Sequence, residues 1–454
     1  MRGKLRSTGA LLCVATAAVV IFGITAFLIG NEGQGVRSPQ GVSLAASESD
    51  VGQNPVERAA AAAQEAGVGE LLTPEFLRIC EQESPGICGK LAEKLQSRAA
   101  FDQSWFWQLS GKTLHYYEAL ARPADNVYDT GRDDGPAVLA FTGDVNFADD
   151  WHNMIHYAGT AGITDCFGES LLEEMRSADV LLCNNEFSIS DRGSPMPGKR
   201  FTFRAKTDNV SMWHQLGADI VGLANNHCFD YGEEAFIDTL DTLTEAGIPY
   251  VGAGRNIREA MEPRFFLAGG MKIGYIACTR AEKHILTPGA GENSPGVLCC
   301  YEPELAEQAI RQAKEQCDYL AVYVHWGTEG STVLEQAQTE LAGRFQQAGA
   351  DLIVGAHPHV LQGTGWRKDT PVIYSLGNFW FNMKSMDTAL LKVTINQPGA
   401  AGAEVQLLPC VQTGGRVSLL EDTTERQRVW NSLNTVAESG YFDENGVLRK
   451  SDVV

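Results

Sequence analysis

The sequence has little positive charge, and its cysteines form no Cys-x-x-Cys motif. Its 454 residues include 36 lysines and arginines against 57 aspartates and glutamates, which gives a formal net charge of −21. Such a chain repels nucleic acid unless a local basic patch intervenes, so we expect no nucleic-acid partner. The 11 cysteines include no Cys-x-x-Cys pair, which gives no support to a zinc ribbon or a dithiol redox motif.

The cysteines leave the disulfide pattern open. An oxidising compartment would permit disulfides, and Cys80 and Cys88 are close enough in sequence to pair. Cys183 and Cys278 lie inside apolar runs, where a thiol usually packs as a small buried hydrophobic group. The connectivity does not follow from the sequence.

One long apolar run lies near the N-terminus. Residues 9–30 contain 22 residues without a charge, enough to span a bilayer as a helix. Three basic residues precede the run and Glu32 follows it, which favours an N-terminus inside the cell and the remainder outside. A cleaved signal peptide is the alternative, but the run is long for one. We expect a single-pass protein of the cell membrane, with residues 1–30 as cytoplasmic tip and anchor and the main domain extracytoplasmic.

Composition divides the rest of the chain into four segments. Residues 31–54 are rich in Gly, Ser, Gln and Asn, which is typical of a flexible stalk. Residues 55–136 combine helix-forming sequence with a turn-rich linker. Within residues 137–410, short apolar runs alternate with amphipathic stretches, which indicates an α/β fold with strands buried on both faces. Residues 411–454 are interpreted as a C-terminal helical extension.

The periodicity places individual elements within the α/β segment. The runs at 389–395 and 403–411 have no helix between them, which predicts antiparallel strands closing the unit. Helices are expected near 168–178, 207–216, 232–246, 303–316 and 335–348.

Potential metal ligands follow almost every apolar run. In α/β folds, ligands gather at the carboxyl ends of the strands. Carboxylates, asparagines and imidazoles together suit Mn, Fe or Zn and not a structural thiolate site. A single histidine after a strand is more often a packed core or turn residue, so the whole set carries the argument. The set is Asp144, Glu186, Asn226, His227, His325, His357, His359 and Asn378.

The stretch GAHPHV, residues 355–360, places two histidines two positions apart. Along an extended chain, side chains at i and i+2 project the same way, so His357 and His359 can face one pocket. Pro358 restricts the backbone between them. Two such imidazoles can serve two ions about 3.5–4 Å apart, as in a two-metal hydrolytic centre. Glu186 is then the natural candidate for the bridging carboxylate.

Taken in order, these motifs resemble the CapA/PgsA family of poly-γ-glutamate capsule biosynthesis proteins, within the calcineurin-like metallophosphoesterase superfamily. The resemblance implies a four-layer α/β/β/α sandwich with two divalent metal ions. It covers roughly residues 137–410, and its motifs are TGDV, NNEF, NNHCFDYG, VHWGTE, GAHPHV and SLGNF.

The resemblance also implies a role for each motif residue. Asp144 and His359 would bind the first metal, and Glu186 would bridge. The second metal would be bound by Asn226, His325 and His357. His227 would be the general acid, or would polarise the substrate. Asn146 is a further candidate ligand for the first metal. It stands where the superfamily has histidine, and asparagine is the poorer ligand.

A basic segment, RGSPMPGKRFTFRAK at residues 192–206, bears on the substrate. A solvated loop is the plain interpretation. However, FTFRA resembles a family segment, and Arg204 suits bidentate contact with a carboxylate or phosphate. We expect Arg204, Asn185 and Asn378 to contact substrate.

Together these features predict a membrane-anchored, extracytoplasmic CapA-like protein. It would support synthesis or export of poly-γ-glutamate or a similar anionic polymer, with that polymer and a membrane polyglutamate synthase complex as partners. If it catalyses, it would be a metal-dependent hydrolase of phosphoesters or amides, with His227 assisting the leaving group. The alternatives are a non-catalytic scaffold that binds polymer or synthase, which Asn146 keeps open, and a general extracytoplasmic metallophosphoesterase.

Overall fold

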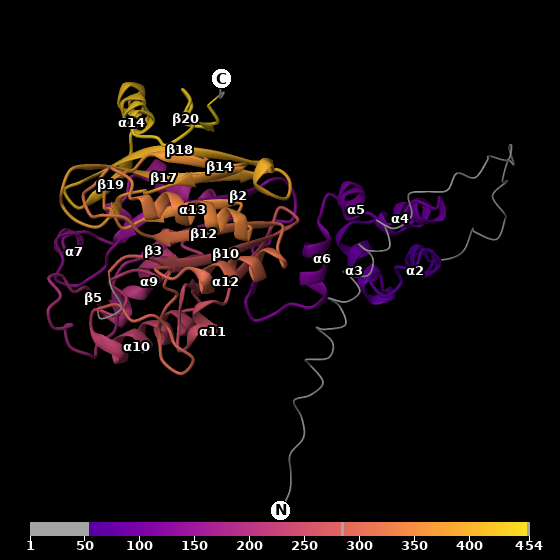
Figure 1. Cartoon of the computed structure of the whole chain (residues 1–454), viewed down its shortest axis with the longest axis horizontal. Coiled ribbons are helices and arrows are strands. Elements are labelled where there is room, and N and C mark those ends of the chain that lie inside the picture. The colour runs from indigo at the N-terminus through magenta and orange to yellow at the C-terminus, as the bar shows by residue number, and fades with distance from the viewer. Residues whose placement is uncertain (1–53, 283–285, 452–454) are drawn as a thin grey trace, which may run out of the picture. The chain divides into compact units, whose positions relative to one another are not determined.

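The computed structural model describes residues 54–282 and 286–451 of the chain (Figure 1). The expected anchor at 1–30 and the stalk at 31–54, apart from its last residue, lie outside this part. Among the described residues, no helix combines the length and the apolar character that crossing a bilayer requires. All of the described residues belong to one compact unit.

Five helices form the N-terminal part of the described chain. Thr73 shows how one of them begins, because its hydroxyl accepts a hydrogen bond from the backbone N–H of Phe76 at 3.2 Å and so caps the first turn. Their apolar faces bury a cluster that includes Leu77 and Phe106. The helices are α2 (Pro55–Glu65), α3 (Pro74–Glu83), α4 (Ile87–Gln96), α5 (Gln103–Ser110) and α6 (Leu114–Ala121).

Cys80 and Cys88 lie in this helical cluster, and the pairing that their proximity in sequence allows is not formed. Both thiols are buried and free, and the Cys88 Sγ donates to the carbonyl of Leu77 at 3.3 Å. Burial raises the pKa of the Cys88 thiol to about 12, which keeps it protonated and unreactive near neutral pH. Cys183 and Cys278, as expected, are buried within strands.

Two large sheets follow the helices. The first has the order β1 (Val127–Asp129), β9 (Arg264–Ala268), β10 (Met271–Thr279), β12 (Tyr319–His325), β13 (Leu352–Ala356), β15 (Thr370–Ile373) and β14 (Thr364–Arg367). The second has the order β19 (Arg416–Leu419), β18 (Ala403–Thr413), β17 (Met386–Ile395), β2 (Ala137–Val145), β3 (Val180–Asn185), β6 (Ile220–Gly222) and β7 (Tyr250–Val251), with β16 (Asn378–Trp380) also paired to β2. The central strands β10, β12 and β13 are parallel, and so are β2, β3, β6 and β7.

Shorter strands and further helices complete the unit. Three two-stranded pairs are β4 (Ser188–Ile189) with β5 (Arg204–Ala205), β8 (Ala253–Gly254) with β11 (Gly296–Val297), and β20 (Tyr441–Phe442) with β21 (Leu448–Arg449). The helices are α7 (His152–Tyr157), α8 (Glu169–Ser177), α9 (Ser211–Leu216), α10 (Gly232–Glu245), α11 (Ile257–Ala260), α12 (Glu304–Lys314), α13 (Gln336–Ala348) and α14 (Thr423–Thr435).

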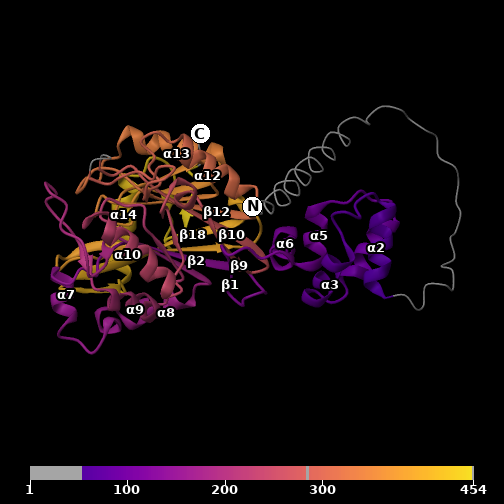
Figure 2. The same ribbon diagram turned by 90° about the horizontal axis from the view of Figure 1, so that it is seen from below.

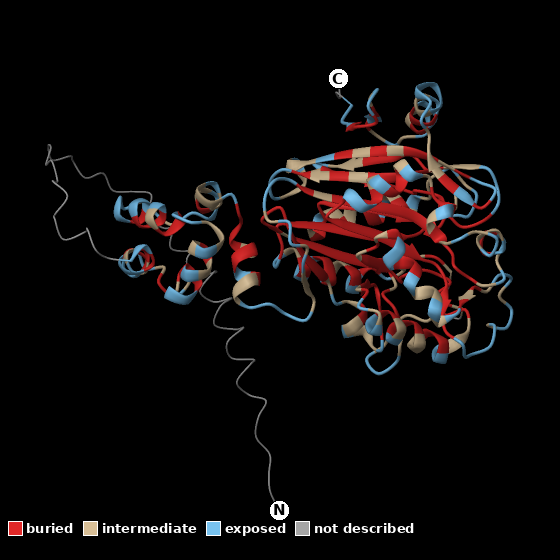
Figure 3. Ribbon diagram, turned by 180° about the vertical axis from the view of Figure 1, so that it is seen from behind, coloured by how far each residue is buried: buried red, intermediate tan, exposed pale blue. Residues whose placement is uncertain are grey.

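The core lies on both faces of both large sheets. One buried cluster fills the space between them and includes Leu139, Ile273 and Leu391. Other clusters join the first sheet to α12 and α13, and the second sheet to α8, α9 and α10, an order of layers that Figure 2 shows. The central strands such as β3, β12 and β13 are accordingly buried throughout, whereas edge strands such as β1 and β19 and the outer sides of the helices are partly exposed (Figure 3). The prediction of a mixed α/β fold is confirmed.

The expected helices of the α/β segment are present as α8, α9 with the 3₁₀ turn before it, α10, α12 and α13. The antiparallel pair is present as β17 and β18. The boundary at residue 410 differs, because β18 continues to Thr413 and β19 adds an edge strand. The last helix, α14, packs on the second sheet. There the Trp430 indole N–H donates to the carbonyl of Leu407 in β18 at 3.1 Å.

Replacing Leu391 with alanine should test the packing between the sheets. Leu391 is 0% exposed within the inter-sheet cluster, so its truncation leaves a cavity. We expect a loss of about 2–5 kcal/mol in the free energy of unfolding. The control is Val333→Ala, at a residue that is 75% exposed, for which we expect a change below about 0.5 kcal/mol. Chemical denaturation measures both, and equal losses would contradict this packing.

Candidate metal centre

The site forms where strands of both sheets end. Asp144 lies in β2 and Glu186 directly follows β3, whereas His325 ends β12 and His357 follows β13. The two sheets are joined here by a hydrogen bond from the Tyr323 hydroxyl to the carbonyl of Thr142 at 2.9 Å. The site therefore takes its acids from one sheet and two of its imidazoles from the other.

The glycine before Asp144 allows the backbone to come close enough. A Cβ at Gly143 would lie 1.9 Å from the carbonyl oxygen of Gly377, so no other residue fits there without moving the chain. That same carbonyl accepts a hydrogen bond from the backbone N–H of Asp144 at 2.9 Å. The pairing of β16 with β2 then places Asn378 opposite Asp144.

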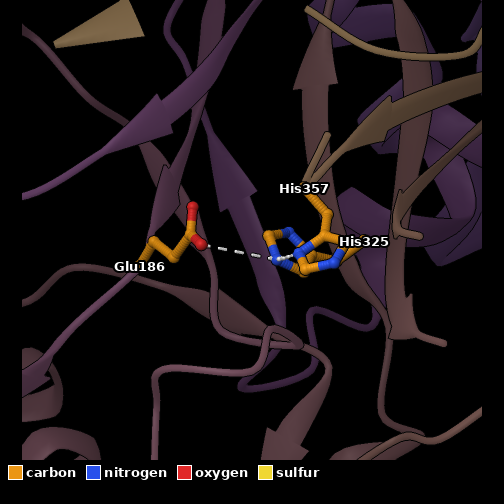
Figure 4. A group of neighbouring side chains, drawn as sticks. All are labelled: Glu186, His325 and His357. Carbon is orange, nitrogen blue, oxygen red and sulfur yellow. Dashed lines mark hydrogen bonds and ion pairs between the residues drawn. The ribbon is translucent and has the colours of Figure 1, made fainter. Parts of the chain in front are cut away.

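Two groups of side chains bring three possible ligand atoms each within 4.8 Å of one another. One group is Glu186, His325 and His357 (Figure 4), and the other is Asp144, Glu186 and His359. Glu186 belongs to both groups. Its Oε1 lies 3.6 Å from the His325 Nε2 and 3.7 Å from the His359 Nε2. A carboxylate shared in this way has the position of a bridge between two cations.

The donor set fits divalent cations. The Oε1 of Glu186 is buried and has no hydrogen-bond partner among the described residues, which is costly for a carboxylate unless a cation satisfies it. The surrounding donors are imidazoles and one more carboxylate, a combination that suits Mn, Fe or Zn. Among the described residues, no lysine or arginine donates a hydrogen bond to this oxygen of Glu186 in place of a cation.

Hydrogen bonds hold the remaining ligands in place. The Asn226 Oδ1 lies 2.8 Å from the His325 Nε2, and the His357 Nδ1 lies 3.1 Å from that same nitrogen. On the other side, the His359 Nδ1 lies 3.0 Å from Asp144 and 2.9 Å from the Oδ1 of Asn378. Asn378 thus lies against a candidate ligand and also lines the cavity at the site.

The backbone at the two histidines differs from the expected extended chain. Strand β13 ends at Ala356, and the φ angles of His357 and His359 are 95° and 58°. Both values lie in the left-handed region, which non-glycine residues rarely adopt and which clusters at functional sites. The expectation of strand alternation was wrong here. A turn, in place of a strand, aims both imidazoles at the shared carboxylates.

His227 lies beside the shared carboxylate, with its Nε2 3.9 Å from the Oε1 of Glu186. Its Nδ1 lies 2.7 Å from the carboxylate of Asp230, which directs the Nε2 towards the candidate ligands. Asp230 is held in turn by the backbone N–H of Phe203 at 2.6 Å and by an ion pair with Lys199 at 2.7 Å. The Lys199 ammonium also donates to the backbone carbonyl of Asn226.

Comparison with known proteins identifies the family. The model of the bacterial capsule synthesis protein family PGA_cap matches residues 138–383. The chain belongs to this family. The resemblance to CapA/PgsA proteins is thereby confirmed.

The PGA_cap relatives match only part of the chain. The capsule biosynthesis protein CapA of Bacillus anthracis is 30% identical over 249 residues, which are 53% of this chain and 59% of that protein. The PGA biosynthesis protein CapA of Bacillus subtilis is 28% identical over 278 residues, which are 60% of this chain and 72% of that protein. The chain therefore spans less than two thirds of the B. anthracis relative.

Solved structures add little to this assignment. The NAD nucleotidase of Haemophilus influenzae aligns with 68% of this chain and 65% of its own, with 15% identity and a TM-score of 0.37. A TM-score this low supports no inference about fold or function.

The structure brings most of the predicted PGA_cap site residues together. Three of them, Asn146, Arg204 and Asn185, are engaged elsewhere. Within the described residues, none of these three side chains forms a hydrogen bond to a candidate metal ligand. The Asn146 Oδ1 accepts from the backbone N–H of Ala148 at 2.7 Å. The Arg204 guanidinium donates to the carbonyl of Arg192 at 2.8 Å and lies over the ring of Tyr231. The roles suggested for Asn146 and Arg204 stay predictions.

Asn185 is the third of these residues, and the motif NNEF alone did not show which of its two asparagines faces the site. Its amide donates to the carbonyl of Phe187 at 2.7 Å and its oxygen accepts from the Trp213 indole. Asn184, which was not singled out, instead donates to Asp144 at 2.8 Å and to Glu186 at 3.4 Å. Strand alternation was the available signal, because Asn184 and Glu186 are two positions apart and share a face that Asn185 does not.

Burial and mutual charge set the protonation of the ligands. Burial, with the nearby charge of Asp144, raises the pKa of Glu186 well above its usual value. Burial, followed by the charge of His359, lowers the pKa of His357 to about 3, and burial likewise lowers the pKa of His325. Burial also acts to lower the pKa of His359. The hydrogen bond of His359 with Asp144 outweighs this effect, so the pKa of His359 is raised.

Metal binding to this chain should therefore release protons. Groups with raised pKa values, Glu186 and His359, hold protons that a cation must displace, whereas His325 and His357 are already neutral. We expect Mn²⁺ affinity to rise with pH, by about tenfold per unit for each displaced proton. Calorimetry in two buffers of different ionisation enthalpy measures this release, and a binding heat independent of buffer would contradict it.

Variants at the shared and unshared ligands should differ in metal content. Glu186→Ala removes a ligand from both groups, so we expect it to abolish tight binding of both ions, whereas His357→Ala should spare the group of Asp144 and His359. His115→Ala is the matched control, because His115 contacts Glu118 away from the site. Elemental analysis after dialysis gives the stoichiometry. Equal metal loss in the Glu186 and His357 variants would argue against a shared carboxylate.

Proposed function

We propose that this chain is an accessory protein of poly-γ-glutamate, or of a similar anionic capsule polymer, with a hydrolase-type centre for two divalent cations. The observation that carries the hydrolase part is the buried Glu186, which two ligand groups share. The two sheets with helices on their outer faces support a four-layer α/β/β/α sandwich of the metallophosphoesterase type.

The polymer part of the proposal rests on the family. Its relatives carry names that refer to capsule, PGA and polyglutamine synthesis. We infer by analogy that this chain supports synthesis or export of such a polymer, with the polymer and a membrane synthase complex as partners. The apolar run at residues 9–30 supports a membrane anchor with the main domain outside the cell.

The chain's own residues divide the chemistry among them. Asp144, Glu186, Asn226, His325, His357 and His359 would hold the cations. When bound, two cations would supply Lewis-acid polarisation of a phosphoester or amide. His227 is placed to transfer a proton, because Asp230 occupies its Nδ1 and leaves its Nε2 facing the site. Lys199 balances the charge of Asp230 and so preserves that orientation.

A non-catalytic scaffold is the second candidate, and one observation favours it. Asn146 stands where the superfamily has a histidine ligand, and its Oδ1 is taken by the backbone N–H of Ala148. The group of Asp144, Glu186 and His359 then has one ligand fewer than expected, which would weaken the first metal. In this case the fold would bind polymer or synthase without turnover.

Replacing His227 with alanine should separate the two candidates. If His227 transfers a proton, hydrolysis of bis-p-nitrophenyl phosphate by the Mn²⁺-loaded chain should fall about 10²–10⁴-fold. Metal content should be unchanged, since His227 belongs to neither ligand group. His115→Ala should retain full activity. A wild-type chain that holds no metal, shows no hydrolysis and binds polyglutamate would favour the scaffold.

A further inference from the structure

A cavity of about 770 Å³ opens next to the metal centre. His227 and His359 are among its lining residues, and both are in contact with aromatic rings. The ring of Phe203 lies 4.4 Å from that of His227, and the ring of Phe381 lies 4.8 Å from that of His359. The cavity therefore begins at the candidate proton donor and at a candidate ligand.

The aromatic contacts continue outward as one chain of rings. Phe203 contacts Phe381 at 5.5 Å and Trp151 at 4.8 Å between ring centres. Trp151 in turn contacts Phe201, 5.9 Å away, which is 44% exposed at the rim. We call Phe201, Trp151, Phe203 and Phe381 the aromatic wall. Met383, also 44% exposed, lines the same cavity.

The cavity carries almost no charge to match a polyanion. Among its described lining residues, Lys384 is the one lysine or arginine, and Glu329 opposes it. A γ-linked glutamate chain presents one carboxylate per residue and would need a row of cations. The basic residues of 192–206 do not supply that row, because none of them is among the described lining residues.

Two of these five basic residues form ion pairs with acids outside the segment. Arg192 pairs with Asp238 and Glu234, and Lys199 pairs with Asp230 and Glu282. The segment carries Phe201 and Phe203 to the cavity. The guanidinium of Arg200 lies over the ring of Phe201, and that of Arg204 lies over the ring of Tyr231.

We propose that the cavity takes an amphiphilic anion: one anionic group at the metal centre, bonded to one aromatic or aliphatic group that packs on the aromatic wall. The proposal rests on the hydrolase-type centre of the proposed function and specifies its substrate class. The interior of a polyanionic chain is excluded from this class. Apolar burial against the wall favours such a ligand, because each ring removed from water contributes to binding.

Matched phosphonates test this without turnover. Phenylphosphonate and octylphosphonate add an apolar group to the anion that methylphosphonate presents alone. With Mn²⁺ present, we expect at least one of them to bind the full-length chain about tenfold more tightly than methylphosphonate. Preference for the octyl compound would point to a lipid-like source, and preference for the phenyl compound to an aryl ester. Equal affinities for all three, or tighter binding of a γ-glutamate oligomer, would overturn the proposal.

Two variants locate the preference at the aromatic wall. Phe201→Ala removes an exposed ring with little risk to folding, and Trp151→Ala removes the ring behind it. We expect each to reduce the apolar preference severalfold while leaving methylphosphonate affinity unchanged. Val333→Ala, a residue 75% exposed and absent from the cavity lining, is the control. An apolar preference retained in both wall variants would place the binding elsewhere and contradict the assignment.

The same protein samples separate this inference from the proposed function. If the protein binds metal and hydrolyses the phosphodiester but shows no preference for the apolar phosphonates, only the cavity assignment is overturned. Apolar preference in protein that binds no metal and hydrolyses nothing would overturn the hydrolase proposal and the place of the anionic group, and would leave only the role of the aromatic wall standing.

Discussion

The buried carboxylate of Glu186 among imidazoles depends on how two sheets pack. Asp144 and Glu186 come from the ends of strands in one sheet, and His325 and His357 come from the ends of strands in the other. The apolar cluster between the sheets holds these ends together. Because protein interiors are close-packed, a small shift of one sheet against the other would separate both acids from the imidazoles at the same time.

Charge explains why the centre needs such support. Two carboxylates buried side by side repel each other, and burial lowers the pKa of His325 and His357 beside them, which keeps these two imidazoles neutral. The arrangement has one acid oxygen with no hydrogen-bond partner among the described residues, and two histidines in left-handed backbone. Strain and unsatisfied polarity of this kind persist only where the surrounding fold holds them, and they fit a centre built for divalent cations.

The charge of the residues around the candidate metal centre distinguishes two proposed roles, binding of a polymer and binding of a small anion. The proposed function connects the chain with an anionic polymer, yet the cavity at the candidate metal centre has an aromatic wall and a single lysine among its described lining residues. The two proposals would be compatible if a small amphiphilic anion bound at the centre and the polymer bound elsewhere on the protein. The loop 192–206 illustrates the point, since Arg192 and Lys199 pair with acids while its phenylalanines line the cavity.

The sequence alone determined the α/β alternation, most helices and the set of residues at the strand ends, because hydrophobic periodicity and motif order are local properties. It also identified Glu186 as the bridging candidate. Tertiary structure decided what converges: Asn184 and not Asn185 faces the acids, a turn aims His357 and His359, and Trp151 joins Phe381 in one wall. These outcomes depend on contacts between residues far apart in the chain, which local patterns do not encode.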